Sequence, residues 1–196
     1  LYRNGTMYSS YTAASFAQLY KLANKYNVNL QGAVSWSFEF ENEPWFAGFR
    51  DLATNGVDKP VLNVFRMFGM MKGDMLEVKN TNALSLQKIV DSSVRGNQSY
   101  VDAIAATDAH DMFIMLWNYH DDDVIKPALP VEITIDLGNI ESISGFSLNT
   151  AAGRADVNWP VMISVLVSEN GKDFYEVVDL ANLYPDRFLP AKEYTI

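Results

Sequence analysis

Hydrophobic and polar residues follow two different periods in the first part of the chain. Between Ser10 and Tyr26, apolar side chains recur three or four positions apart, which predicts an amphipathic helix. The recurring positions are Phe16, Leu19, Tyr20, Ala23 and Tyr26. The segment Val28–Phe40 is mostly apolar without that period, which predicts a strand buried on both faces of a parallel sheet. Pro60 then begins a second helix that ends before Gly73, so the order of elements is typical of an α/β fold.

After Gly73 the pattern changes to short apolar runs separated by turn residues. Such runs predict strands of an antiparallel sheet. The candidate strands are Met75–Val78, Leu86–Val90, Tyr100–Ala106, Met112–Tyr119 and Val131–Leu137. The change of pattern predicts a domain boundary near Gly73-Asp74.

A second change of pattern lies near Leu137-Gly138. The candidate strands beyond it are Ile143–Leu148, Val161–Ser168 and Phe174–Val178. Asn170-Gly171 stands between the last two, and Asn-Gly is a strong indicator of a hairpin turn.

Composition limits the function classes. With 48% hydrophobic and 20% charged residues, the chain has the composition of a folded protein. The net charge of −9 argues against a nucleic-acid partner, and no apolar run has the roughly 18 residues that a membrane span needs. The absence of cysteine excludes disulfides, thiolate metal sites and a cysteine nucleophile. The chain begins with Leu1, so we expect it to be a piece of a longer polypeptide.

The richest candidate site follows the predicted buried strand, where α/β barrels build their active sites. In an extended strand Glu39, Glu41 and Glu43 share one side, with neighbours roughly 6.5–7 Å apart. Their carboxylates could bind sugar hydroxyls, while Trp36 and Trp45 stack on a sugar ring. The alternative is a solvated acidic loop beside two core aromatic residues. Glu39 and Glu41 are not expected to be a catalytic pair, because a glycosidase needs carboxylates on opposite sides of the scissile bond.

Two histidine-containing stretches offer weaker chemistry. His120 precedes three aspartates, a composition that suits a hard metal ion, but the spacing of a calcium loop is absent. We therefore expect a solvated turn after a core strand there, and a surface turn around His110. Met67, Met70 and Met71 follow helical spacing and are expected to fill the core.

Several strings resemble glycoside hydrolase family 39, the β-xylosidase family, in the order in which that family has them. They cover about residues 1–130 and are Tyr2-Arg3-Asn4-Gly5, Ser10-Tyr11-Thr12-Ala13-Ala14, Trp36–Phe49, Leu52–Met67 and Leu116–Asp123. The resemblance implies the C-terminal part of a (β/α)8 barrel over residues 1–73, with 28–40 as its last strand. It also implies an accessory antiparallel β-sandwich over residues 74–131.

The same resemblance implies a role in hydrolysing β-xylosides with retention of configuration. In the family, both catalytic glutamates precede the part matched here, so we expect no catalytic residue in this chain and an inactive isolated chain. Trp36, Glu39, Glu41, Glu43 and Trp45 are the expected substrate-binding residues, with xylosides or xylo-oligosaccharides as the partner. No cofactor and no metal are expected, and a full-length parent is expected in the periplasm or outside the cell.

Residues from about 132 resemble a different family, the discoidin-type (factor 5/8 C-type) domain. The strings that carry this resemblance are Ile135–Gly138, Ile143–Phe146 and Val165–Phe174. They imply a partial jelly roll of the galactose-binding-like type over residues 132–196, without identified ligand residues. Two alternatives remain for the whole chain: a non-catalytic carbohydrate-binding β module and a non-functional remnant.

Overall fold

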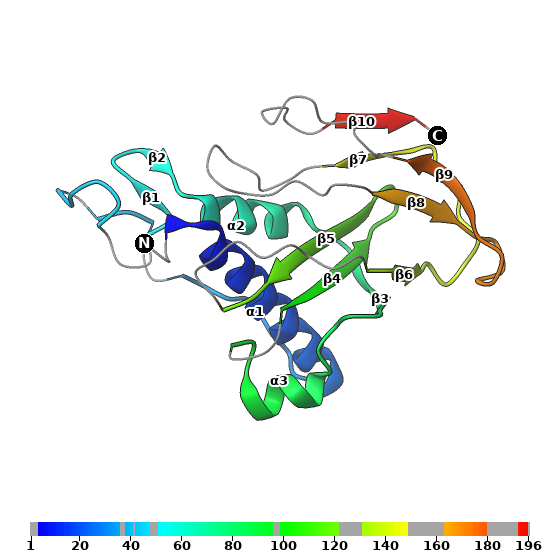
Figure 1. The fold of residues 1–196 in the computed structure, drawn as a ribbon, viewed down its shortest axis with the longest axis horizontal. Helices are drawn as coiled ribbons and strands as arrows, with labels where there is room; N and C mark the ends of the chain where they lie inside the picture. Colours follow the sequence, from blue (N-terminus) through cyan, green and yellow to red (C-terminus); the bar gives the residue numbers. More distant parts are fainter. Residues whose placement is uncertain are drawn as a thin grey trace. The chain divides into compact units, whose positions relative to one another are not determined.

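The computed structural model describes residues 4–35, 38–40, 42–47, 51–95, 99–121, 131–148, 163–179 and 192–195 (Figure 1). It contains helices and antiparallel sheets, which confirms a mixed α and β chain. The chain divides into two compact units, Leu1–Ile135 and Asp136–Ile196.

The described residues of the first unit form three helices and six strands, the last of which extends one residue past the unit boundary. The helices are α1 (Thr6–Lys25), α2 (Pro60–Met70) and α3 (Leu86–Ser92). The strands are β1 (Ala53–Thr54), β2 (Val57–Asp58), β3 (Asp74–Asn80), β4 (Tyr100–Thr107), β5 (Met112–Tyr119) and β6 (Ile133–Asp136). Four of them form one sheet in the order β5-β4-β3-β6, while β1 and β2 pair with each other. The unit boundary falls within β6.

Helix α1 lies against the β4–β5 part of this sheet through small residues (Figure 1). Ala13, Ala14 and Ala17 are buried, and they share a core with aromatic side chains of the two strands. Those aromatic residues are Tyr100, Trp117 and Tyr119. Alanines allow the helix backbone to come close to the sheet, because the large rings fill the remaining space.

The helix at Ser10–Tyr26 is confirmed, but its predicted apolar stripe is only partly buried. Leu19, Tyr20 and Tyr26 are exposed, and the sheet-facing side uses the alanines instead. Phe16 packs edge-on against Phe65 of α2, with ring centroids 5.4 Å apart.

Helix α2 begins at Pro60 as predicted and ends before Gly73. A proline suits the first helical turn, because its missing N–H would have no partner there. Gly73 has φ +79°, and a Cβ at this position would overlap the backbone carbonyl of Thr107. Glycine is therefore required where the chain leaves α2 and enters β3.

The predicted strand Leu86–Val90 is wrong, because these residues form the helix α3. Ser85 caps this helix, with its hydroxyl oxygen accepting the backbone N–H of Lys88 at 3.2 Å. Ile89 is the buried residue of the helix and packs into the main core. The segment is too short for its hydrophobic periodicity to distinguish a helix from a strand. The Ser85 cap and the burial of Ile89 select the helix.

The predicted buried strand over residues 28–40 is also wrong in the structure. Described residues 28–35 and 38–40 form no strand, and the side chains of Val34 and Phe38 are 95% and 57% exposed. A strand needs neighbours to pair its backbone N–H and C=O groups. Among the strands that the structure describes, none pairs with this segment. Its apolar composition alone does not make it a strand.

The predicted boundary at Gly73-Asp74 lies inside the first unit. The main core combines residues from both sides of it, such as Ala14 and Val64 before, and Tyr100 and Trp117 after. Gly73-Asp74 thus marks a change of secondary structure within one compact body.

The second unit contains two pairs of antiparallel strands. β7 (Gly145–Leu148) pairs with β10 (Lys192–Thr195), and β8 (Ser164–Val167) pairs with β9 (Tyr175–Asp179). The predicted hairpin turn at Asn170-Gly171 is confirmed between β8 and β9. Across the described parts of both units, no helix combines the length and apolar character that a membrane crossing requires.

Candidate functional site

The hairpin formed by β1 and β2 lies at the centre of the candidate site. Its two turn residues, Asn55 and Gly56, have φ angles of 46° and 75°. Two consecutive positive φ values are typical of a type I′ turn, which favours Asn-Gly. The hairpin pairs Ala53 with Asp58 and Thr54 with Val57.

The loop over described residues 38–40 and 42–47, here called the 38–47 loop, is fastened to this hairpin through the backbone. The carbonyl oxygen of Phe38 accepts the N–H groups of Leu52 at 2.9 Å and Ala53 at 3.0 Å. At its far end, the N–H of Phe46 donates to the buried Thr54 hydroxyl oxygen at 2.9 Å. The loop is thus fixed at both ends along one side of the hairpin.

Glu39 joins the loop to the tip of the hairpin. Both of its carboxylate oxygens lie within hydrogen-bond distance of the Gly56 N–H, at 3.0 and 3.3 Å. Asn55 contacts the same loop, because its Nδ2 donates to the Glu43 carbonyl oxygen at 3.4 Å. The carboxylate of Glu39 therefore positions the turn that carries Asn55.

An open hollow lies between the loop and the hairpin tip. Its lining residues are Glu39, Phe40, Asn42 and Asn55, and its volume is about 520 Å³. The side chain of Trp45, in the same loop, is 61% exposed. Two amides, a carboxylate and aromatic rings can together bind a polyhydroxylated ligand, because amides donate and accept hydrogen bonds while rings pack on apolar C–H groups.

The structure places the expected substrate-binding residues differently with respect to the hollow. Glu39 lines the hollow, whereas Glu43 contacts the hairpin through its backbone. Trp36 and Glu41 lie outside the described residues. The run from Glu39 to Glu43 is not extended throughout, because Asn42 has φ 61°.

Sequence reasoning missed Asn42 and Asn55 as lining residues of the hollow. The Asn-Gly pair at Asn55-Gly56 was a recognisable indicator of a tight hairpin. Nothing in the sequence placed that hairpin beside the 38–47 loop, because this contact depends on backbone hydrogen bonds between separate segments.

His110 lies in the turn between β4 and β5, whereas most of the stretch that follows His120 lies outside the described residues. His110 is exposed, and its backbone N–H donates to the Asp108 carboxylate at 2.9 Å. This bond and a second one from the Asp111 N–H lower the pKa of Asp108. His120 follows β5, while Asp122 and Asp123 lie outside the described residues. Within the described residues, no group of three acidic or histidine side chains is arranged to hold a metal ion.

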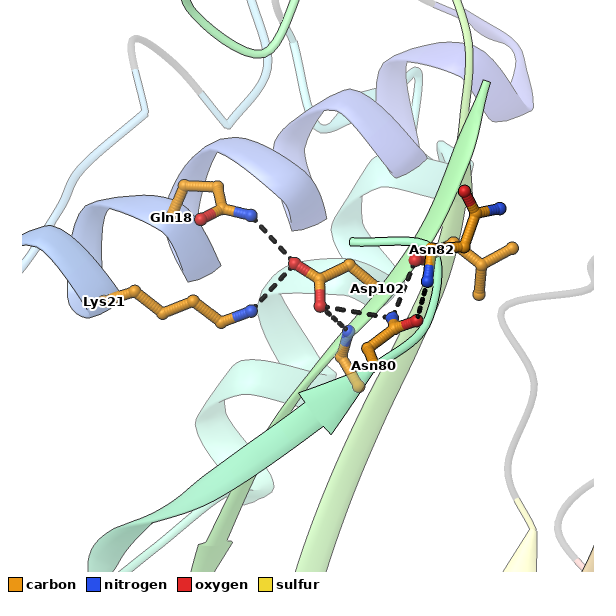
Figure 2. Close-up of polar contacts among 7 residues, drawn as sticks. Gln18, Lys21, Asn80, Asn82 and Asp102 are labelled. Carbon is orange, nitrogen blue, oxygen red and sulfur yellow. Dashed lines mark hydrogen bonds and ion pairs between the residues drawn. The ribbon is translucent and has the colours of Figure 1, made fainter. Parts of the chain in front are cut away.

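A buried polar cluster between α1 and the sheet centres on Asp102 of β4 (Figure 2). Its carboxylate oxygen Oδ2 accepts from Lys21 Nζ at 2.8 Å and from Gln18 Nε2 at 2.9 Å. Its Oδ1 accepts the Ala103 N–H at 2.8 Å and lies 3.4 Å from Nδ2 of Asn80. The side chain of Asp102 is 1% exposed, so these donors replace its hydration. The cluster therefore joins α1 to the sheet.

Tyr100 lies next to this cluster on the same strand. Burial raises its pKa to about 12, an effect that the Trp117 indole N–H partly opposes and the charge of Asp102 reinforces. Among the described residues, the Tyr100 hydroxyl and Trp117 Nε1 have no hydrogen-bond partner of standard geometry. The hydroxyl is therefore neutral and structural at physiological pH.

Comparison of the chain with protein-family models, with curated proteins and with solved structures gives no match.

Proposed function

We propose that this chain supplies one wall of the sugar-binding site of a retaining glycoside hydrolase that acts on β-xylosides, without supplying a catalytic carboxylate. The observation that carries the proposal is the open hollow between the 38–47 loop and the hairpin tip. The sequence resemblance to the β-xylosidase family points to the same loop.

The chemistry of the hollow suits a pentose. Sugar hydroxyls both donate and accept hydrogen bonds, and the amides of Asn42 and Asn55 offer both functions. Glu39 adds an acceptor whose position is set by the Gly56 N–H. Phe40 lines the hollow, and Trp45 of the same loop is exposed. Each aromatic ring can pack against the C–H face of the sugar.

The proposal assigns no catalytic role to the hollow. Retaining hydrolysis needs two carboxylates about 5–5.5 Å apart on either side of the scissile bond. Among the described lining residues Glu39 is the carboxylate, and it already accepts a backbone N–H. We expect the isolated chain to show no β-xyloside turnover.

The proposal extends to the architecture. Residues 1–73 would be the end of a (β/α)8 barrel, 74–131 an accessory β-sandwich and 132–196 part of a discoidin-like jelly roll. In such a barrel, neighbouring strands would cover the apolar side chains of residues 28–40 that are exposed here, such as Val34. The segment would take up its strand conformation only against those neighbours.

The test is calorimetric titration of the chain with xylobiose. We expect weak binding that Asn55→Ala reduces roughly tenfold, because truncation leaves sugar hydroxyls without the Asn55 amide as a partner. Asn139→Ala is the matched control, because Asn139 is an exposed asparagine of the second unit.

Three outcomes would count against the proposal. If the chain does not bind xylobiose, the proposed sugar-binding wall is wrong. Binding that neither Asn55→Ala nor Trp45→Ala weakens would place the sugar elsewhere and favour the alternative, a non-catalytic binding module in the β-rich part. Hydrolysis of an aryl β-xyloside that disappears in Glu39→Gln would show that the carboxylate is catalytic.

A further inference from the structure

The chain contains three Asn-Gly pairs, at Asn4-Gly5, Asn55-Gly56 and Asn170-Gly171. An Asn-Gly pair can cyclise, because glycine has no Cβ to hinder attack of its nitrogen on the preceding side-chain amide. The three pairs differ in the hydrogen bonds that their side-chain amides and glycine N–H groups make. We expect these hydrogen bonds to decide which asparagine cyclises.

Asn170 is held in place by its own loop. Its Oδ1 accepts the N–H groups of Lys172 and Asp173, both at 2.8 Å, and its Nδ2 donates to the Asp173 carboxylate at 2.7 Å. The attacking atom, the nitrogen of Gly171, donates to the Ser168 hydroxyl oxygen at 2.9 Å. These bonds hold the side-chain amide in the loop and oppose the rotation that attack requires, and the Ser168 hydroxyl is a poor base for the Gly171 proton.

Asn4 is restrained by the 38–47 loop. Its Nδ2 donates to the Phe46 carbonyl oxygen at 2.9 Å, and its buried Oδ1 accepts no hydrogen bond from a described residue. Attack on this amide would place negative charge on a buried oxygen to which no described residue donates, which is costly.

Asn55 differs from both. The residue is exposed, no described residue donates to its Oδ1, and its Nδ2 makes one long bond of 3.4 Å. The N–H of Gly56 points at the Glu39 carboxylate, at 3.0 and 3.3 Å. A side chain at Gly56 would meet nothing within 4 Å, so the approach is open. The same space is open at Gly171, so the difference rests on the side-chain amide and the base.

We propose that Asn55-Gly56 is a succinimide-forming modification site, with the Glu39 carboxylate as the acceptor of the Gly56 amide proton. The Gly56 nitrogen forms a bond to Cγ of Asn55 while its proton passes to Glu39. The tetrahedral intermediate then expels ammonia, which takes back the proton from Glu39. Solvent water opens the cyclic imide at either carbonyl and gives aspartate or isoaspartate. The net reaction consumes one water and releases one ammonia.

The modification would change the hollow directly. Asn55 and Glu39 both line it, so conversion places a second carboxylate beside the first and removes an amide donor. In the isoaspartate product the backbone is longer by one carbon, which the type I′ turn does not accommodate. The reaction therefore alters both the charge and the shape of the hairpin tip.

The experiment is incubation of the folded chain near neutral pH, followed by proteolysis and mass spectrometry of the three Asn-Gly peptides. We expect Asn55 to gain about one mass unit at least roughly tenfold faster than Asn170 or Asn4. In Glu39→Gln the rate at Asn55 falls while the other two rates stay unchanged. Glutamine can still accept the Gly56 N–H through its Oε1, so the turn is kept but the base is lost.

Two controls separate this mechanism from a property of the local sequence. Glu43→Gln removes a neighbouring negative charge but leaves the Glu43 backbone contact, and it should not slow Asn55. In urea the three asparagines should react at similar rates. Equal rates in the folded chain, an undiminished or faster rate in Glu39→Gln, or a preference for Asn55 that persists in urea would each overturn the proposal.

Discussion

Asp102 is a buried carboxylate that takes its donors from two elements besides its own strand. Gln18 and Lys21 reach it from α1, and Asn80 reaches it from β3 (Figure 2). A carboxylate without hydration needs such donors, because an unpaired buried charge is strongly destabilising. One residue thereby connects a helix to two strands of the sheet.

Asp102→Ala is expected to lower the free energy of unfolding by about 2–3 kcal/mol. Lys21 loses its partner, but it is 20% exposed and regains part of its hydration, so the loss is smaller than for a fully buried pair. Urea denaturation measures the change. Asp91→Ala on exposed α3 is the control and should cost no more than about 0.5 kcal/mol. Equal losses in the two variants would contradict a special role for Asp102.

Tyr100 predicts a pH dependence at the alkaline end. Its folded pKa of about 12 lies above the model-peptide value of 10.0, so the unfolded chain releases this proton first as pH rises. The stability from keeping the hydroxyl neutral is present below about pH 10 and is lost between about pH 10 and pH 12. Tyr100→Phe should remove this dependence, measured as the difference between the two proteins in urea melts. Parallel pH profiles would show that Tyr100 titrates normally.

Short elements depend on their caps and contacts more than on their hydrophobic pattern. Leu86, Ile89 and Val90 are compatible with a strand or with one face of a helix. The Ser85 cap and the burial of Ile89 select the helix α3. Longer elements such as β4 and β5 had no such ambiguity and are strands as predicted.

Ser85→Ala should destabilise α3 by about 1 kcal/mol, because the Lys88 N–H loses its acceptor. Hydrogen exchange should report the loss as faster exchange confined to residues 86–92. Ser85→Asp keeps an acceptor at the cap and should preserve protection. An unchanged exchange pattern in Ser85→Ala would mean that the core contact of Ile89 alone holds the helix.

Gly73→Ala should be more damaging than a typical surface substitution. The added Cβ would overlap the Thr107 carbonyl, and φ +79° is unfavourable for alanine. We expect a loss of about 2 kcal/mol or more in thermal or urea unfolding. Gly32→Ala is the matched control, because a Cβ there meets nothing within 4 Å. A similar small effect at both glycines would show that the α2–β3 connection adapts.

At the scale of the whole molecule, the first unit has a main core between α1 and the sheet and a set of apolar side chains outside it. Val34, Phe38 and Trp45 are 95%, 57% and 61% exposed. They lie in or next to the 38–47 loop, so the apolar surface and the candidate hollow belong to the same part of the chain. Large apolar side chains as exposed as these are available to bind an apolar molecule.

The folded chain is therefore expected to bind a hydrophobic dye under native conditions. A variant with Val34→Asn, Phe38→Asn and Trp45→Asn should bind less dye and keep its melting temperature, because none of the three belongs to the main core. Dye fluorescence with a parallel thermal melt measures both. A native chain that binds no dye would contradict the exposure of these side chains.

The sequence alone determined the long helices, the strands β4 and β5, the hairpin turn at Asn170-Gly171 and the start of α2 at Pro60. These features follow from local periodicity and from the fixed backbone preferences of proline and glycine. The sequence also indicated the loop that carries Glu39. It predicted an extended run from Glu39 to Glu43, which the positive φ of Asn42 interrupts.

Only the tertiary structure decided the rest. It placed the Asn55-Gly56 turn against Glu39 and showed that α1 buries its alanines rather than Leu19. It also left residues 28–35 and 38–40 without a partner among the described strands. Each of these depends on whether a second, distant segment is present to complete a hydrogen bond or a packed layer. The sequence of an apolar segment is the same whether or not neighbouring strands are present. Whether it forms a strand therefore depends on backbone pairing with those neighbours and not on its own residues.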